Sequence, residues 1–325
     1  MEKVTVVIPN YNGRDFLQEC LQSLKKQASG TPEFKVVVVD NGSQDGSAKL
    51  VQEEYPQIEL EALQENTGFC HAVNIGIKKA HSPFVILLNN DAKVFPDFVS
   101  ALCHAIEKRP DAFAVSAKML MWDKPDLMDD AGDRYCALGW AYGRGKGKPA
   151  KEYDRAVQVF SACGGAAIYR RAVFEKIGLF DEAHFAYLED LDIGWRARIY
   201  GYRSFYEPSA QVLHYGSAST GSRYNETKTV LAAANNVYVV GKNMPLFQKL
   251  INLPFLVMGF FVKFLFFMKR GMGGFYLQGI LQGLKKLYSR EGRKKKVPFR
   301  PEHFGNYLAI QGQLYLNLVR FLKKT

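Results

Sequence analysis

The sequence predicts an α/β protein in which a mainly parallel sheet is covered by helices on both faces. Over residues 1–120, short runs rich in valine and isoleucine alternate with segments of helical periodicity. The runs are continuously apolar, which is typical of strands buried on both faces. The composition, 47% hydrophobic and 23% charged over 325 residues, is that of a globular chain with one large domain or about two ordinary ones.

Each predicted element rests on a local pattern. Within residues 13–27, five apolar side chains fall on one helical face: Phe16, Leu17, Cys20, Leu21 and Leu24. The remaining helices are expected at residues 47–55, 72–80 and 98–106, and the strands at residues 4–8, 36–39, 58–63 and 85–88. Residues 121–160 are rich in Asp, Gly, Lys and Arg and predict long loops around a site, with residues 139–151 as a lid or a plain surface loop.

Polar residues follow three of the predicted strands at the point where each strand ends. They are the segments 9–12 (Pro-Asn-Tyr-Asn), 40–47 (Asp-Asn-Gly-Ser-Gln-Asp-Gly-Ser) and 89–91 (Asn-Asn-Asp). Such residues also form ordinary turns. Ligands bind at the carboxyl ends of parallel strands, however, so three polar segments at equivalent positions favour a pocket at one sheet edge. The chain has no GxGxxG after its first strand and no GxxxxGK[ST], which argues against dinucleotide dehydrogenases and P-loop NTPases.

A second group of candidate residues lies between residues 160 and 215. Small residues over 161–167, including Gly164 and Gly165, allow a backbone or ligand to approach closely. Three carboxylates, Glu189, Asp190 and Asp192, open a predicted helix and could supply a general base or simply complement the helix dipole. A lone histidine, His214, follows a short apolar strand; it is structural unless the fold brings it near Asp91.

Six segments together resemble the family 2 glycosyltransferases, above all the rhamnosyltransferase-like branch of bacterial polysaccharide assembly. The resemblance covers roughly residues 3–240 and rests on VIPNYN at 7–12, VDNGSQDGS at 39–47, NTGF at 66–69, LNND at 88–91, GGA at 164–166 and EDLDIGWR at 189–196. It implies a GT-A fold, a nucleotide-diphosphate-sugar donor, a divalent metal (Mg²⁺ or Mn²⁺) and inversion at the anomeric carbon.

The resemblance also implies roles for individual residues. The nucleotide-sugar would contact Pro9, Tyr11, Asp40, Asn66, Gly68, Asn89, Asn90 and Arg196, and the metal would be held by Asp91 and His214. Asp190 matches the catalytic base, and the acceptor pocket would contain Glu189, Asp192, Gly164 and Gly165. One departure is Asn89, which replaces the first aspartate of the family's DxD motif. An amide oxygen can ligate a hard cation but carries no charge, so weaker metal binding is expected.

Charge is distributed unevenly along the chain. Residues 1–240 contain 27 Lys and Arg against 30 Asp and Glu, whereas residues 241–325 contain 16 against 2. The division predicts a slightly acidic GT-A domain over 1–240 and a basic, apolar helical region over 241–325. Within this region, the 19 residues 250–268 are mostly apolar and just long enough to span a bilayer, but Asn252, Pro254, Gly259 and Lys263 interrupt them. This region could be a buried helical subdomain, a spanning helix or, as we favour, interfacial or re-entrant helices on an anionic membrane.

The sequence therefore predicts an inverting glycosyltransferase that extends a lipid-linked glycan at the cytoplasmic face of the cell membrane. Alternatives within the class are transfer of another sugar (hexosamine, galactofuranose or hexose) or transfer onto polyprenyl phosphate. From another class, the chain could be an inactive sugar-nucleotide or membrane-docking module. Nucleic acid is not expected as a partner, because the basic residues of the tail are interleaved with long apolar runs. The five widely spaced cysteines include no CxxC, which favours reduced thiols.

Overall fold

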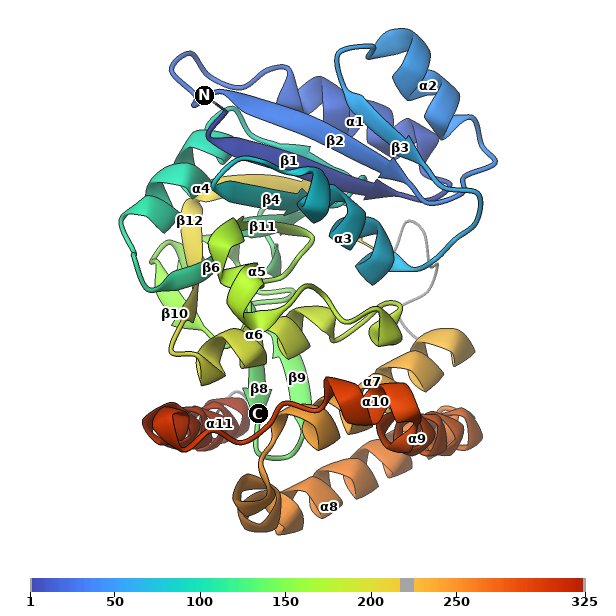
Figure 1. Cartoon of the computed structure of the whole chain (residues 1–325), viewed down its shortest axis with the longest axis vertical. Coiled ribbons are helices and arrows are strands. Elements are labelled where there is room, and N and C mark those ends of the chain that lie inside the picture. Colours follow the sequence, from blue (N-terminus) through green and yellow to red (C-terminus); the bar gives the residue numbers. More distant parts are fainter. Residues whose placement is uncertain (1, 217–224, 324–325) are drawn as a thin grey trace.

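A mixed sheet forms the centre of the protein, for which the computed structural model describes residues 2–216 and 225–323. Its main path runs β10-β12-β6-β11-β4-β1-β2-β3, with β5 paired to β12 and β7 paired to β6 (Figure 1). The strands are β1 (Val4–Asn10), β2 (Phe34–Asp40), β3 (Glu59–Ala62), β4 (Phe84–Leu88), β5 (Ala92–Val94), β6 (Ala112–Met121), β7 (Met128–Asp130), β10 (Val157–Val159), β11 (Ala166–Arg170) and β12 (Arg203–His214). The strands β1 to β4 are parallel, as the sequence predicts.

Helices cover both faces of this sheet. They are α1 (Arg14–Leu24), α2 (Ser47–Glu54), α3 (Phe69–Lys79), α4 (Phe98–Glu107), α5 (Arg171–Ile177) and α6 (Glu189–Ile199). Side chains of α1, α2 and α4, such as Leu17, Val51 and Leu102, share one buried cluster with the sheet. Side chains of α3, α5 and α6, such as Val73, Val173 and Ile193, share another. The predicted α/β class and the helices predicted in residues 13–106 are thereby confirmed.

The antiparallel strand β11 brings distant parts of the sequence together. It lies between β4 and β6, so that Ala166 is opposite Leu88. The backbone N–H of Asn89 donates to the carbonyl of Gly165 at 2.8 Å, which places the loop before β11 beside the residues after β4. Farther along, His214 at the end of β12 pairs with Ala92 of β5. Two segments more than 70 residues from β4 therefore reach the same sheet edge.

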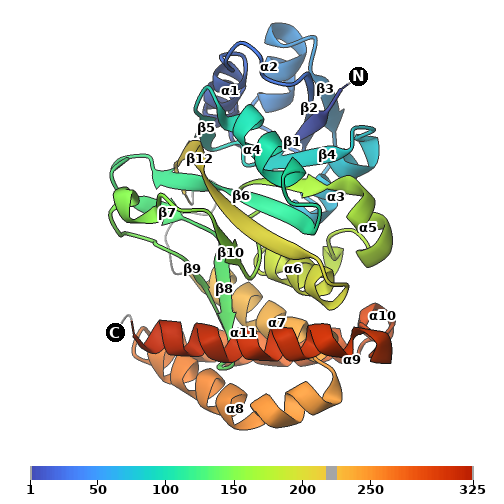
Figure 2. The ribbon, with the colours of Figure 1, turned by 90° about the vertical axis from the view of Figure 1, so that its left-hand side faces the viewer.

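Residues 121–160 contain more regular structure than the sequence predicts. They include β7, the hairpin β8 (Asp133–Cys136) and β9 (Trp140–Gly143), the short helix η1 (Ala150–Tyr153) and β10. The hairpin projects from the sheet toward the C-terminal helices (Figure 2). Trp140 Nε1 donates to the carbonyl of Gly259, and Tyr142 Oη donates to the carbonyl of Asn317. Residues 140–143 are thus anchored to the helices, which does not support a free lid there.

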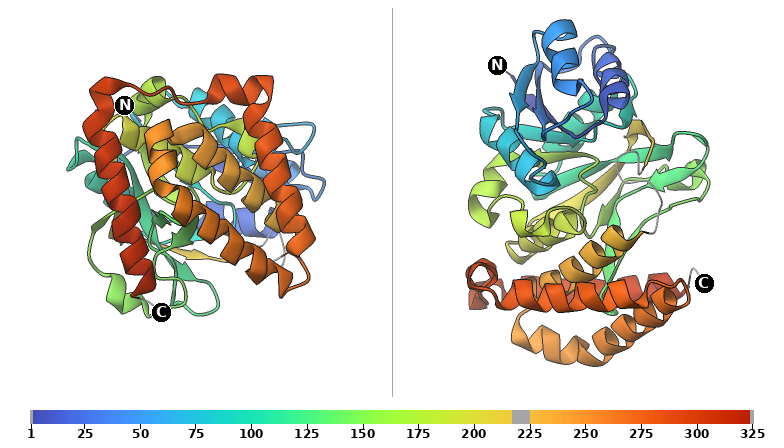
Figure 3. Two further views of the ribbon diagram at one scale, coloured as in Figure 1. Left: turned by 90° about the horizontal axis from the view of Figure 1, so that it is seen from below. Right: turned by 90° about the vertical axis from the view of Figure 1, so that its right-hand side faces the viewer.

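The C-terminal helices form a layer across one end of the molecule. They are α7 (Glu226–Asn243), α8 (Leu246–Met268), α9 (Gly273–Tyr288), α10 (Arg290–Lys295) and α11 (Phe304–Leu322), with short helices η2 (Glu182–His184) in the domain above and η3 (Pro301–His303) before α11. Seen from below, α11 and α9 flank α8 (Figure 3). The predicted boundary at residue 240 falls within α7, so the helical layer begins about 15 residues earlier, at Glu226.

Candidate active site

The loops after β1 and β2 form one wall of the candidate site. Asp40 is buried, and its carboxylate accepts hydrogen bonds from Asn10 Nδ2 at 2.7 Å and from the backbone N–H of Ser43 at 3.0 Å. Asn10 in turn accepts from Asn90 Nδ2 at 2.7 Å, which joins the ends of β1, β2 and β4. Pro9 lies half-buried in β1, and Tyr11 is exposed directly after it. The sequence-predicted nucleoside residues therefore gather at one sheet edge.

Asn66 and Gly68 belong to a second hydrogen-bonded turn next to this wall. Asn66 Oδ1 accepts from Asn41 Nδ2 at 3.1 Å and from the backbone N–H of Gly68 at 3.0 Å. Gly68 has a φ of +88°, and a Cβ there would meet the Phe185 ring at 2.6 Å. Only glycine fits both the backbone conformation and this contact. The turn therefore brings residues 66–68 against the segment that precedes α6.

Asn89, Asp91 and His214 meet at the end of β4. His214 Nε2 lies 3.2 Å from Asp91 Oδ1 and 3.4 Å from Asn89 Nδ2. His214 Nδ1 lies 2.7 Å from a carboxylate that the sequence reasoning did not select, Asp129 of β7. Burial alone would lower the pKa of His214, but Asp129 and Asp91 outweigh burial and raise the pKa to about 9. The fold thus brings His214 close to Asp91, which the sequence made the condition for a functional role of this histidine.

Asp190 lies in the first turn of α6 and faces the loop before β11. Its Oδ2 accepts from the backbone N–H of Gly164 at 2.9 Å, whereas its buried Oδ1 has no hydrogen-bond donor among the described residues. A Cβ on Gly164 would meet Oδ1 at 2.5 Å, and a Cβ on Gly165 would meet Asn89 Nδ2 at 3.1 Å. The two glycines therefore leave room for the carboxylate of Asp190 and the amide of Asn89.

Several carboxylates around Asp190 have raised pKa values. Burial, followed by the charge of Glu189, raises the pKa of Asp190 well above its usual range. Burial also raises the pKa of Glu189 to about 7. Asp130 and Asp133, on β7 and β8, contribute to the same electrostatic field, and burial raises the pKa of Asp133 to about 7. Clustered, desolvated carboxylates with perturbed pKa values are typical of active sites.

Asp192 and Arg196 are not brought into this site. Asp192 lies two residues after Asp190, about 200° further around the helix, and is fully buried. It is 2.9 Å from Arg196 Nη2 and 2.9 Å from Lys242 Nζ, and Lys242 also pairs with Asp181 at 2.6 Å. Arg196 additionally donates to the carbonyl of Leu179 at 2.9 Å. These contacts form a buried ion-pair network between α6 and α7, so neither side chain can contact an acceptor or a nucleotide.

This network also contains a compact set of potential metal ligands. One atom each of Asp181, His184 and Asp192 lie within 4.8 Å of one another. Lys242 already lies on both carboxylates, and burial lowers the pKa of His184 to about 4, so the imidazole is neutral. Because the cationic position beside these carboxylates is filled by a lysine, the cluster is better explained as a structural ion pair than as a metal site.

The segment leading into Asp190 has an unusual backbone. Phe185, Tyr187 and Leu188 have φ values of +60°, +72° and +65°. Buried Asn235 of α7 holds this segment, because its Nδ2 lies 2.9 Å from the carbonyl oxygen of His184 and 2.8 Å from those of Ala186 and Tyr187. Lys286 of α9 donates to Asn235 Oδ1 at 2.8 Å. The C-terminal helices therefore fix the conformation of the loop from which Asp190 extends.

The parallel sheet edge, the acidic cluster and the glycine-lined approach to Asp190 are the features of a GT-A glycosyltransferase. The family model "Glycosyl transferase family 2" matches residues 5–178, slightly more than half of the chain. The chain therefore belongs to glycosyl transferase family 2 and is a glycosyltransferase. Its mixed sheet with parallel β1 to β4 is the GT-A fold.

Among curated relatives, the chain is 31% identical over 240 residues to the N-acetylglucosaminyl-diphospho-decaprenol L-rhamnosyltransferase of Mycobacterium tuberculosis, which covers 66% of this chain and 77% of the relative. It is 24% identical over 212 residues to a poly-beta-1,6-N-acetyl-D-glucosamine synthase of Staphylococcus aureus, covering 65% of this chain but only 49% of that protein. The rhamnosyltransferase match agrees with the predicted branch of the family.

Two solved structures share the fold at low sequence identity. GalNAc-T7 with UDP, GalNAc and Mn²⁺ superposes with a TM-score of 0.60 at 16% identity, covering 74% of this chain and 48% of that one. The mannosyltransferase PcManGT from Pyrobaculum calidifontis, in complex with GDP-Man and Mn²⁺, has a TM-score of 0.53 at 18% identity, covering 96% and 86%. The second likeness extends over nearly the whole chain, including the C-terminal helices.

Proposed function

We propose that this protein is an inverting transferase that moves a sugar from a nucleotide-diphosphate-sugar to a hydroxyl of a lipid-linked glycan in cell-surface polysaccharide assembly. The observation that carries the proposal is the position of Asp190, whose free Oδ1 lies on the same sheet edge as the Asn89–Asp91 segment. The name of the Mycobacterium tuberculosis relative supports rhamnose as the sugar and a polyprenyl-diphosphate-linked acceptor.

Asp190 is suited to act as the base in a single displacement. The acceptor hydroxyl oxygen forms a bond to the anomeric carbon while the bond from that carbon to the diphosphate oxygen breaks. The hydroxyl proton passes to Asp190 Oδ1, and the nucleoside diphosphate leaves with the bonding electrons. The raised pKa of Asp190 makes its carboxylate a stronger base than an exposed aspartate. With one displacement and no covalent enzyme intermediate, the configuration at the anomeric carbon inverts.

The residues at the end of β4 fit a divalent cation. Buried Asp91 Oδ1 accepts no hydrogen bond in the described part of the chain, and His214 Nε2 lies 3.2 Å from it. Asp129 contacts the other ring nitrogen of His214, as carboxylates commonly do behind metal-bound histidines. Asp91 and His214 would hold the ion, with His214 releasing its Nε2 proton on binding and Asn89 serving as a neutral oxygen ligand. When bound, Mg²⁺ or Mn²⁺ would neutralise charge on the departing diphosphate.

The helical layer supports placement at a membrane surface. Exposed apolar residues recur on α8 with helical spacing, at Leu250, Leu253, Val257, Phe261, Leu265 and Met268. The helix is long and apolar enough to cross a membrane, and it lies outermost, beyond α9 and α11, at the end of the molecule farthest from the sheet (Figure 2). With the basic residues of 241–325, this arrangement favours interfacial helices on the anionic cytoplasmic face, beneath a catalytic domain that ends before α7.

A donor-hydrolysis screen tests this proposal. The full chain would be incubated with a panel of sugar nucleotides, each with Mg²⁺, Mn²⁺ or chelator, and released nucleoside diphosphate would be measured. We expect one donor to be hydrolysed in a metal-dependent way, with a nucleotide-diphosphate-rhamnose the first candidate, and Asp91→Ala to abolish the metal dependence. Absence of hydrolysis and of nucleotide binding with every donor would instead support an inactive docking module.

A further inference from the structure

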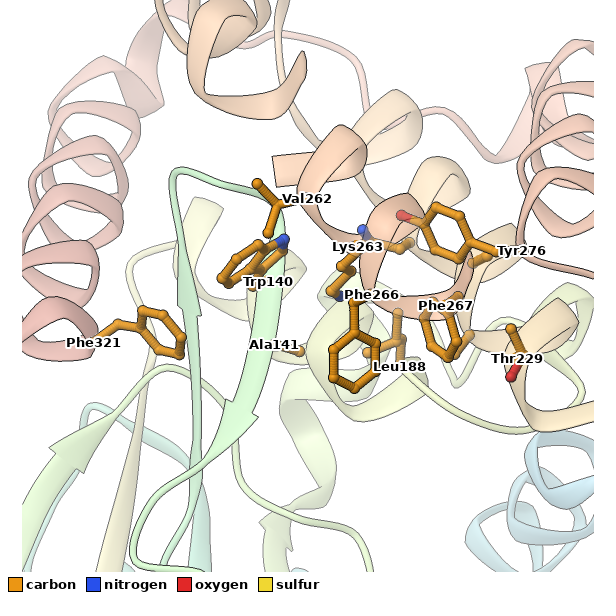
Figure 4. Close-up of a pocket in the computed structure, with 13 residues that line it drawn as sticks. Trp140, Ala141, Leu188, Thr229, Val262, Lys263, Phe266, Phe267, Tyr276 and Phe321 are labelled. Carbon is orange, nitrogen blue, oxygen red and sulfur yellow. The ribbon is translucent and has the colours of Figure 1, made fainter. Parts of the chain in front are cut away.

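A cavity of about 470 Å³ lies between the β8–β9 hairpin and the helical layer. Five aromatic rings line it, with Trp140 and Phe321 on one side, Phe267 and Tyr276 on the other, and Phe266 between them (Figure 4). Its size is in the range of cavities that bind small molecules. None of the residues used above for the donor or the metal lines this cavity.

Two polar groups in this apolar cavity lack partners. Tyr276 is buried, and its Oη has no hydrogen-bond partner within residues 2–216 and 225–323. Lys263 is half-buried and, within the same residues, makes no ion pair or hydrogen bond; its Nζ lies 6.0 Å from the centre of the Trp140 ring. Burial lowers the pKa of Lys263 to about 8, so the ammonium remains mostly charged at neutral pH. A buried hydroxyl without a partner is costly unless a ligand bonds to it, and the half-buried ammonium of Lys263 offers a cationic group to an anionic ligand.

The cavity is adjacent to the loop of residues 185–188, which leads into α6 and Asp190. Leu188 lines the cavity and is the residue immediately before α6, which begins with Glu189 and Asp190. On the other side, Val262 and Phe266 of α8 line the cavity, and the apolar outer face of α8 continues outward from them. A ligand in the cavity would therefore lie between the exposed apolar surface of α8 and the start of α6, where Asp190 lies.

We infer that this cavity binds the isoprenoid diphosphate end of the lipid-linked acceptor, with Lys263 and Tyr276 contacting its phosphates and the aromatic rings contacting its first isoprene units. The inference rests on the proposed function and extends it to a specific acceptor site. A ligand with one anionic group and one apolar chain matches the cavity, because its lining residues include one cation, Lys263, and several aromatic rings. A nucleotide-sugar lacks the apolar chain and would leave the rings in contact with polar groups.

Isothermal titration of the detergent-solubilised full chain with farnesyl diphosphate tests the site without requiring catalysis. We expect Lys263→Met to weaken binding at least tenfold and Tyr276→Phe to weaken it severalfold, whereas Lys263→Arg should remain within about threefold of the unmodified protein. Lys269→Met is the matched control, because Lys269 is exposed just beyond the end of α8 and does not line the cavity. It should change the affinity less than twofold.

Three further ligands show which part of farnesyl diphosphate the cavity recognises. Farnesol should bind weakly and be insensitive to Lys263→Met, and inorganic pyrophosphate should bind weakly because it lacks the chain. A short-chain phosphatidylglycerol should fail to compete with farnesyl diphosphate. Equal competition by phosphatidylglycerol, or unchanged affinity for farnesyl diphosphate in Lys263→Met, would overturn the inference. Failure of donor hydrolysis with intact, Lys263-dependent farnesyl diphosphate binding would instead refute only the proposed transferase activity.

Discussion

Replacing Asn235 by alanine should slow sugar transfer although the residue lies outside the site. The Asn235 side chain is fully buried, and its Nδ2 is within 2.9 Å of three backbone carbonyls in the loop before Asp190. That loop contains three non-glycine residues with positive φ, each of which costs about 1–3 kcal/mol. Backbone hydrogen bonds, such as that from Cys70 N–H to the Phe185 carbonyl at 3.3 Å, also hold this loop, but Asn235 is the side chain that contacts three of its carbonyls.

The expected magnitude follows from the hydrogen bonds. Two N–H hydrogens serve three carbonyls, so two bonds are lost at about 1 kcal/mol each, and a buried carbonyl left unpaired adds about 1–3 kcal/mol. We therefore expect the free energy of unfolding to fall by about 3–5 kcal/mol, less any strain that the loop releases when it relaxes. Relaxation moves Asp190, so kcat should fall at least tenfold while the KM for the donor changes less than threefold.

Steady-state kinetics and urea unfolding would be measured together on Asn235→Ala and on Asn252→Ala. Asn252 is an equally buried asparagine that hydrogen-bonds Gln311 at 2.8 Å, far from the catalytic loop. Asn252→Ala should lower the free energy of unfolding by a comparable amount and leave kcat unchanged. Lys286→Met, which removes the donor to Asn235 Oδ1, should reproduce part of the kinetic effect. If Asn235→Ala is destabilised but retains kcat within twofold, the loop does not position Asp190 and the reasoning is refuted.

Four further outcomes are expected. Asp190→Asn should abolish transfer but keep the donor Kd within threefold by calorimetry; parallel loss of both would make Asp190 structural. Gly164→Ala should lower kcat strongly with little change in stability measured by urea unfolding, because its Cβ would displace Asp190 Oδ1 from 2.5 Å away. The pKa of Glu189, raised to about 7 from 4.5, means that the folded state binds more protons between these values. Stability should therefore fall by about 3 kcal/mol as pH rises through that window. Glu189→Gln should make this fall smaller by about 3 kcal/mol between pH 5 and pH 8 in urea unfolding, leaving the part due to Asp133, and parallel curves for both proteins would contradict it. Lys242→Met should cost about 3–5 kcal/mol in urea unfolding, because it removes the buried cation that Asp181 and Asp192 share, and a loss below 1 kcal/mol would argue against the network.

Part of the site could be predicted because it depends on local sequence. The apolar runs locate β1, β2 and β4, and the residues that follow a parallel strand must lie at its carboxyl edge. Asp40, Asn90 and Asp91 are therefore close together in any structure with these strands. Gly164 and Asp190 are 26 residues apart, yet the small residues before β11 and the acidic start of α6 already mark both segments.

Other parts of the site have no distinct local signal. Asp129, Asp130 and Asp133 resemble ordinary turn residues within a polar segment, and only the pairing of β7 with β6 brings Asp129 to His214. From their spacing alone, Asp190 and Asp192 are equally plausible bases, because both open the same helix, and only the family resemblance favours Asp190. The structure separates them, since Lys242 of α7, 50 residues later, neutralises Asp192 and leaves Asp190 to face Gly164.

The sequence by itself determined the α/β class, the order of the elements, the family and the separation of an acidic body from a basic, apolar tail. Periodicity and composition are properties of neighbouring residues, so these conclusions need no long-range contacts. Only the tertiary structure decided which carboxylates face the site, how Asn235 holds the catalytic loop, and that rings from residue 140 to residue 321 enclose one cavity. Such features depend on side chains that meet only after the chain has folded, because burial and pairing, not residue type, set their charge and orientation.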